Sequence, residues 1–253
     1  MRLALFSDIH ANLPALQSVL ASIDAHRPDH VFCLGDLVGY APFPNEVVEL
    51  IRRRNIATIA GNYDEGVGVN SDDCGCAYQT DEDQERGNQS IAYTNEVIHA
   101  DHRRWLRELP RHIRLQVGPK AKTSILLVHG SPRKINEYLF EDRPEKSLLR
   151  IIKGADADVM AFGHTHKPFH RVLVDEDEGR TRHAINTGSV GKPKDGDPRA
   201  CWTLVDIDLS GDEDSSTVEV EFIRVSYDVE AAARAVEESL LPDAFAQMLR
   251  QGG

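Results

Sequence analysis

The first part of the chain alternates short apolar runs with stretches of helical periodicity, and this alternation restricts the fold more than any other feature. Apolar runs at residues 2–6, 31–34 and 56–60 have the length of buried strands. Between them, residues 13–23 and 44–53 place apolar side chains at helical spacing. A strand, a helix and a second strand in this order form a βαβ unit with parallel strands. The sequence therefore predicts an α/β fold.

Each of these three runs ends on glycine or a polar residue. Asp8 and His10 follow the first run, Asp36 follows the second, and Asn62 follows the third. The carboxyl ends of parallel strands meet at one edge of a sheet, where open α/β folds bind ligands. A buried strand rarely ends on a bare carboxylate for packing reasons. We therefore expect Asp36 to face a cation, with the other three side chains close to it.

The later part of the chain adds strands of both kinds. Strands are predicted at residues 113–117, 124–128 and 158–162, with a helix at 145–153. Strands without long helices between them follow at 170–174, 181–185, 201–208 and 218–227. The acidic runs at 175–179 and 211–214 are interpreted as solvated turns, and 228–240 and 244–249 as helices. No boundary is evident, so residues 1–253 are predicted to form a single domain.

Residues 65–100 lack clear periodicity and contain one predicted helix, at about residues 84–98. A connection this long is usually a functional lid or a disordered segment. We interpret it as a lid or specificity loop, with a plain surface excursion as the alternative. It carries Cys74-Gly75-Cys76, which is too closely spaced for a structural zinc pattern. These cysteines are interpreted as free thiols on a loop, or as neighbours of the substrate. A further helix is predicted at 101–109, capped by Asp101.

Seven polar residues follow predicted strands directly and form a mixed set of nitrogen and oxygen ligands. Two carboxylates, four imidazoles and one amide suit Mn, Fe, Co, Ni or Zn and suit Ca or Mg poorly. Seven ligands exceed what one ion with an open position needs, whereas two ions that share a carboxylate fit the number. Such pairs of ions catalyse in-line displacement at phosphorus. The seven residues are Asp8, His10, Asp36, Asn62, His129, His164 and His166.

Composition restricts the partners of the chain. The formal net charge is −12, from 41 acidic and 29 basic residues, which opposes binding to long nucleic acids. A small phosphoester is the expected substrate. The chain has four cysteines and no apolar run of transmembrane length, and the start of the chain does not read as a signal peptide. We therefore expect a soluble cytoplasmic protein without a membrane partner, and the oligomeric state stays open.

The ordered motifs resemble the calcineurin-like metallophosphoesterase superfamily, and its YfcE-type phosphodiesterase branch in particular. The resemblance covers residues 8–166 and reaches residue 191 with the segment 186–191. It implies two packed mixed β-sheets flanked by helices in a four-layer arrangement. The motifs are Asp8-Ile9-His10, Gly35-Asp36, Gly61-Asn62-Tyr63-Asp64, His129-Gly130 and Gly163-His164-Thr165-His166.

The resemblance also implies a role for each ligand. One ion would be bound by Asp8, His10 and His166, and the other by Asn62, His129 and His164, with Asp36 bridging them. A hydroxide between two divalent transition-metal ions, with Mn expected in vitro, would attack phosphorus. Phosphodiesters or activated esters of small molecules are the expected substrates. The alternatives are a monoester phosphatase, a protein phosphatase, a dinucleoside polyphosphate hydrolase and a non-catalytic scaffold.

Tyr63 stands where phosphatases of this superfamily usually have histidine, while Asp64 is kept. A phenol is a different acid at neutral pH, so a preference for good leaving groups is expected. Three further residues are candidates for substrate contact. Arg133 would contact phosphate or be a surface charge, Asn12 would contact phosphate or cap a helix, and Tyr40 would shape the pocket.

Overall fold

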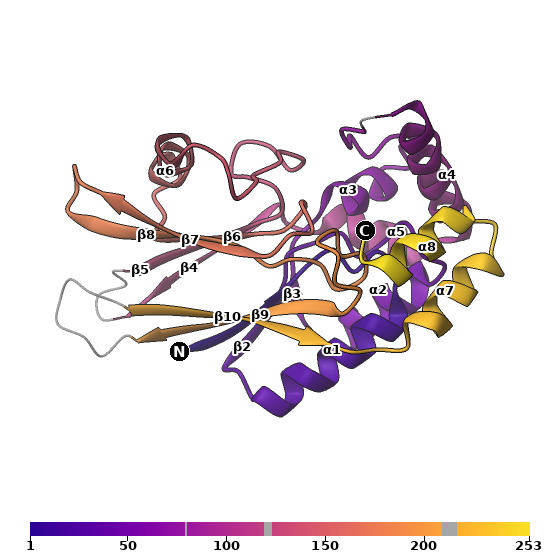
Figure 1. Cartoon of the computed structure of the whole chain (residues 1–253), viewed down its shortest axis with the longest axis horizontal. Helices are drawn as coiled ribbons and strands as arrows, with labels where there is room; N and C mark the ends of the chain where they lie inside the picture. Colours follow the sequence, from indigo (N-terminus) through magenta and orange to yellow (C-terminus); the bar gives the residue numbers. More distant parts are fainter. Residues whose placement is uncertain (79, 119–122, 209–216) are drawn as a thin grey trace.

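Two five-stranded sheets pack face to face in the computed structural model, which describes residues 1–78, 80–118, 123–208 and 217–253. Figure 1 shows helix α6 on the outer side of one sheet and α1 on the outer side of the other. Helices therefore flank both sheets, and the predicted fold of two packed mixed sheets is confirmed.

The first sheet has the strand order β10-β9-β1-β2-β3. Strands β1, β2 and β3 are parallel, as the βαβ pattern predicts, and β9 and β10 join beside β1 in antiparallel pairing. The third strand is shorter than predicted, because Ala60 N turns away and donates to Pro110 O. The strands are β1 (Arg2–Phe6), β2 (His30–Cys33), β3 (Ala57–Thr58), β9 (Ala200–Asp208) and β10 (Thr217–Val225).

The second sheet has the order β4-β5-β6-β8-β7, with β5, β6 and β8 parallel and an antiparallel strand at each edge. Its strands are β4 (His112–Val117), β5 (Thr123–Val128), β6 (Val159–Phe162), β7 (Phe169–Asp175) and β8 (Arg180–Asn186).

The acidic turn between β7 and β8 is solvated only in part, which corrects the interpretation of residues 175–179. Asp175 is 1% exposed, and its carboxylate accepts hydrogen bonds from Lys153 Nζ and Arg182 Nε. The Arg182 guanidinium is itself buried and needs a counter-charge, which Asp175 supplies. The second acidic turn, residues 211–214, lies outside the described residues.

Three helices differ from the sequence prediction. Helix α3 was not predicted, since two glycines interrupt its apolar pattern. Helix α4 begins three residues early, because Thr80 Oγ1 accepts from Asp83 N and acidic residues favour a first turn. Asp101 lies inside α5 and does not cap it. The described helices are α1 (Leu13–His26), α2 (Pro44–Arg53), α3 (Asn62–Gly68), α4 (Asp81–Val97), α5 (Ala100–Glu108), α6 (Glu145–Gly154), α7 (Val229–Glu237) and α8 (Asp243–Gln251).

The central core lies between the sheets, where alternate residues of strands from both sheets interdigitate. Leu3 and Leu5 of β1 face Ile125 and Leu127 of β5 in this layer. The outer face of the first sheet is packed with apolar residues of α1 and α2, and that of the second with residues of α6. With both faces covered, ligands can reach the sheets only at their edges.

Candidate metal centre

The seven predicted ligands follow strands of both sheets and lie close together. Asp8 and His10 follow β1, Asp36 follows β2, and Asn62 is the first residue of α3. His129 follows β5 in the second sheet, where His164 and His166 follow β6. None of the seven side chains is more than 3% exposed. The edge predicted from the first strands is therefore shared with the second sheet.

The backbone at these positions is unusual. A positive φ is rare outside glycine and costs of order 1 kcal/mol, and such residues cluster at functional sites. Five of the seven ligands have one: Asp8 (54°), His10 (49°), Asp36 (55°), His164 (66°) and His166 (61°). Gly35 has a φ of +89°, and a Cβ there would lie 2.3 Å from Gly61 N, so the loops that follow β2 and β3 are in direct contact.

Asp8, His10 and His166 form a first group whose free atoms face one another. His10 Nδ1 donates to Val38 O, and His166 Nδ1 donates to Lys192 O, so the Nε2 atom of each neutral ring carries a lone pair. These two Nε2 atoms lie 3.1 Å apart. Asp8 Oδ1 lies 3.2 Å from His166 Nε2 and has no hydrogen-bond partner among the described residues.

Asp36, His129 and His164 form a second group, and Asn62 lies beside it. His129 Nδ1 donates to Leu34 O, which leaves its Nε2 facing Asn62 Oδ1 at 3.1 Å. Asn62 Nδ2 donates to Cys74 O and thereby fixes that orientation of the amide. The Nε2 atom of His164 has no partner within the described ranges.

Asp36 lies between the two groups. Its Oδ2 atom is 3.7 Å from His10 Nε2 and 3.4 Å from His129 Nε2, while its Oδ1 atom accepts from Tyr63 N at 2.9 Å. Burial alone would raise the pKa of Asp36, but the neighbouring His129 holds it below its usual value. Burial raises the pKa of Asp8.

The donor set fits two cations. Asp8 Oδ1 and His164 Nε2 have no hydrogen-bond partner among the described residues, whereas buried polar atoms otherwise find partners. Imidazole nitrogen and carboxylate oxygen are ligands for first-row divalent metals. Each histidine that a backbone carbonyl orients through Nδ1 has the second contact usual for metal-binding histidines. Which of these residues bind metal stays a prediction.

Asp64 connects the loops after β2 and β3. Its Oδ1 accepts from Leu37 N and its Oδ2 from Gly61 N, both at 2.9 Å. Burial and the nearby Asp36 raise the pKa of Asp64 to about 7. Tyr63 is fully buried and its hydroxyl lies 3.3 Å from Tyr78 Oη, so it faces the 65–100 connection.

A cavity of about 60 Å³ opens beside the ligands. One side is formed by His10, Asp36, His164 and His166. The remaining lining residues, here called the facing wall, are Tyr40, Tyr63, Cys76, Ala77, Tyr78, Tyr138 and Lys194.

The 65–100 connection therefore contributes three consecutive residues to the pocket, 76–78. Cys74 and Cys76 are free thiols whose Sγ atoms lie 2.9 Å apart. Cys76 lies against Asn62 Nδ2 at 3.3 Å, which corresponds to the alternative of thiols near the substrate. The identification of the whole connection as a lid stays a prediction.

Of the predicted substrate contacts, only Tyr40 lines the cavity. Arg133 is exposed and pairs with Glu137, as a surface charge does. Asn12 caps α1, since its Oδ1 accepts from Ala15 N. Residues that the sequence analysis did not single out are Tyr78, Tyr138, Lys192 and Lys194. The Lys-x-Lys pattern directly after the 186–191 motif was the one available signal for the two lysines.

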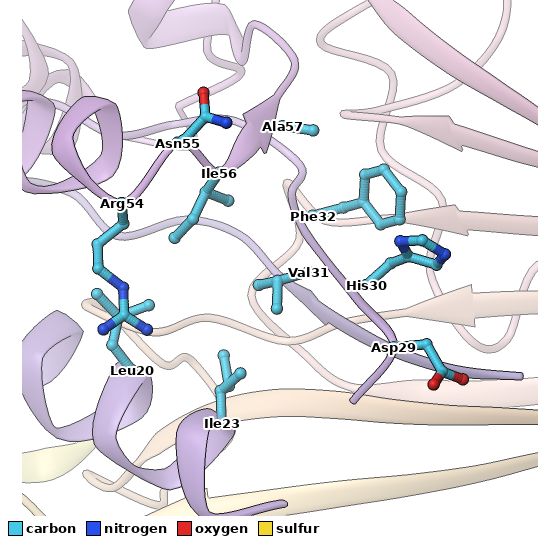
Figure 2. Close-up of a pocket in the computed structure, with 10 residues that line it drawn as sticks. All are labelled: Leu20, Ile23, Asp29, His30, Val31, Phe32, Arg54, Asn55, Ile56 and Ala57. Carbon is cyan, nitrogen blue, oxygen red and sulfur yellow. The ribbon is translucent and has the colours of Figure 1, made fainter. Parts of the chain in front are cut away.

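A larger cavity of about 350 Å³ lies elsewhere, around β2 and the residues before β3. Figure 2 shows that its lining includes Ile23, Val31 and Ile56, with Arg54 at its side. None of the predicted metal ligands lines it. Of these two cavities, the smaller one is therefore the candidate site of the reaction.

The comparison with protein families agrees with this geometry. Residues 1–210 match the model of the calcineurin-like phosphoesterase superfamily domain. The chain belongs to this superfamily. The resemblance seen in the motifs is thereby confirmed, and proteins of this family use divalent metals. The narrower likeness to YfcE-type proteins remains an interpretation of the motifs.

Three similar proteins cover nearly the whole chain. The uncharacterized protein MJ0912 of Methanocaldococcus jannaschii is 32% identical over 265 residues, covering 99% of this chain and 98% of its own. A metallophosphoesterase from Sphaerobacter thermophilus is 31% identical with a TM-score of 0.73, covering 100% and 99%. The hypothetical protein PH1004 of Pyrococcus horikoshii shares the fold, with a TM-score of 0.81 at 24% identity and coverage of 100% and 98%.

The described helices do not have the features of membrane spans. None of those in the described ranges combines the length and the apolar character that crossing a bilayer requires.

Proposed function

We propose that this protein is a phosphoesterase that binds two divalent transition-metal ions and hydrolyses phosphoesters of small molecules. One observation carries the proposal: Asp36 Oδ2 lies between two buried ligand groups, 3.7 Å from His10 Nε2 and 3.4 Å from His129 Nε2. When bound, two ions would lower the pKa of a water and neutralise charge on the phosphoryl oxygens. Mn²⁺ is the first ion to test.

The protein's own contribution is to hold ligands in place and to exclude water. Backbone carbonyls fix the rings of His10, His129 and His166 through Nδ1, so each Nε2 atom points into the site. Asp64 holds the loops that carry Asp36 and Asn62 together. Preorganised groups of this kind stabilise developing charge without reorganisation cost during the reaction.

Tyr63 favours substrates with good leaving groups. Burial raises the pKa of its phenol well above the usual value, so the hydroxyl stays protonated at neutral pH. It can donate a hydrogen bond, but it is a poor proton donor to a leaving alkoxide. Aryl esters, whose leaving groups need little protonation, are therefore the substrates expected to react fastest.

The shape and charge of the molecule support a small substrate. The cavity of about 60 Å³ is far below the roughly 300–1,000 Å³ of pockets that enclose drug-sized ligands. It suits a phosphate group, with the remainder of the substrate outside. The net charge of −12 opposes attraction of long nucleic acids.

Metal analysis followed by an ester screen tests the proposal. The purified protein should bind close to two Mn²⁺ per chain and hydrolyse aryl phosphoesters. His164→Ala should lose both properties, because it removes the unpartnered Nε2 in the second group. His170→Ala is the matched control, since His170 lies on β7 and stacks on His183 outside the cavity lining. A wild-type protein that holds both ions and hydrolyses no ester would contradict the proposal and indicate a scaffold.

A further inference from the structure

Two lysines lie on the loop that follows β8, beside the metal centre. Lys194 lines the cavity together with His10, Asp36 and His166. Lys192 is 7% exposed, and its ammonium lies 4.7 Å from the centroid of the Tyr40 ring, which also lines the cavity. Lys194 therefore adjoins the pocket in which a phosphoester would react, and Lys192 packs on one of the rings that line it.

Neither ammonium has an ion-pair or hydrogen-bond partner in the part of the chain that the structure describes. The nearest carboxylates along the chain are already engaged: Asp195 pairs with Arg224, and Asp197 pairs with Arg199. Asp36 lines the same cavity as Lys194 but makes no ion pair with it. A buried charge without a direct partner is costly, and an anion in the pocket would supply that partner.

The loop is fixed relative to the metal ligands. His166 Nδ1 donates to Lys192 O, and Lys192 N donates to Ser189 Oγ at 2.8 Å. Gly196 N donates to Gly252 O at the end of α8. The lysines are thus attached through the backbone to His166 and held in a defined place.

We propose that Lys194, assisted by Lys192, binds a phosphoryl oxygen of the substrate and selects phosphomonoesters over phosphodiesters. This inference rests on the proposed function and specifies its substrate class. A monoester phosphate carries two negative charges near pH 8, whereas a diester carries one. Because the attraction between charges is strong in a buried site, the unpaired cations favour the group with the additional charge. A monoester phosphatase is one of the alternatives that the motifs left open.

Binding of inorganic phosphate tests the role of Lys194 without catalysis. In the Mn²⁺-loaded protein, Lys194→Met should weaken orthophosphate binding at least about tenfold, the value of one charge-assisted hydrogen bond, and dimethyl phosphate binding less than about threefold. Titration calorimetry measures both. Lys194→Arg keeps the charge and should retain orthophosphate binding. Lys146→Met, an exposed position on α6, is the matched control for loss of one positive charge.

Hydrolysis rates of a monoester and a diester with the same leaving group test the selectivity for monoesters. For p-nitrophenyl phosphate, kcat/KM of Lys194→Met should fall at least about tenfold, and for methyl p-nitrophenyl phosphate less than about threefold. Equal losses for the two esters, or unchanged orthophosphate binding in a folded variant with normal metal content, would overturn the inference. If the wild type hydrolyses neither ester, the proposed function fails, and the orthophosphate measurement alone still decides whether Lys194 binds phosphate.

Discussion

The two sides of the cavity are built differently. The metal-facing side consists of residues at strand ends, and both sheets hold them in place. The facing wall includes Cys76 and Tyr78 of the 65–100 connection, whose segment 74–76 accepts side-chain hydrogen bonds through its backbone. Asn62 Nδ2 donates to Cys74 O, and Asn136 Nδ2 donates to Gly75 O. The difference indicates that the residues for metal binding and those for substrate preference are held in place by different contacts. One set can therefore change without the other.

Asp36→Asn should have the largest effect and be confined to the metal-facing side. The amide removes the charge shared by the two groups, so metal content and activity should both fall, activity by at least about a thousandfold. Metal analysis and rates of aryl ester hydrolysis measure the two effects. Asp24→Asn, which breaks only a surface pair with Arg54, should change neither. An active Asp36→Asn protein with full metal content would contradict the assignment of metal binding and chemistry to the metal-facing side.

Metal affinity should rise with pH, because metal displaces a proton. Burial alone would lower the pKa of His129, but Asp36 raises it to about 10 in the metal-free protein, whereas the pKa values of His10 and His164 lie at about 3. At pH 7–8.5 His129 of the metal-free form therefore holds a proton that it lacks when it binds metal. The affinity for Mn²⁺ should increase about tenfold per pH unit in this interval.

Calorimetry in buffers of different ionisation enthalpy would count the released proton. Tyr78→Phe, a change on the facing wall, should leave the pH dependence unchanged. An affinity that is constant over this interval would show that His129 is already neutral in the metal-free protein.

The metal-facing side can be predicted from the sequence because local patterns encode it. Asp8, Asp36 and His129 each come directly after an apolar run, so strand prediction places them at a sheet edge. The facing wall has no such pattern. The position of Cys76 depends on contacts such as that between Asn136 and Gly75, which are 61 residues apart in the chain. No local periodicity predicts a contact of that kind.

Two features of the fold differ from the sequence prediction because they too depend on contacts distant in the chain. Helix α3 contains Gly66 and Gly68, whose low helix propensity hides it in the sequence. It forms because Asp64 accepts from Gly61 N and because its side chains pack under α5. The buried pair of Asp175 and Arg182 was likewise hidden, since an acidic run reads as a surface turn unless its partner across the hairpin is known.

Gly75→Ala should affect the facing wall alone. Gly75 has a φ of +67°, and a Cβ there would lie 2.5 Å from Asn136 Nδ2, so the segment has to shift at a cost of about 1 kcal/mol or more. We expect KM to rise about three- to tenfold with unchanged metal content. Gly179→Ala is the matched control, since it has a φ of +63° and nothing within 4 Å of its Cβ. Loss of metal from Gly75→Ala would show that the two sides are coupled, through Asn62.

Tyr63→His should have the smallest effect. It tests the separation of the two sides most directly, because residue 63 belongs to both. Its backbone N donates to Asp36 Oδ1, and its ring lies in the facing wall. The backbone contact survives the substitution, so metal content should stay constant. An imidazole is a better acid than the buried phenol, and hydrolysis of alkyl esters relative to aryl esters should rise about three- to tenfold.

Tyr63→Phe controls for this change, since it keeps the ring and cannot donate a proton. It should leave the ratio of alkyl to aryl hydrolysis at the wild-type value or below. If Tyr63→His also leaves that ratio unchanged, residue 63 does not act on the leaving group. Substrate preference would then reside in other residues of the facing wall, of which Tyr78 is the first to test, because its hydroxyl contacts those of Tyr40 and Tyr63.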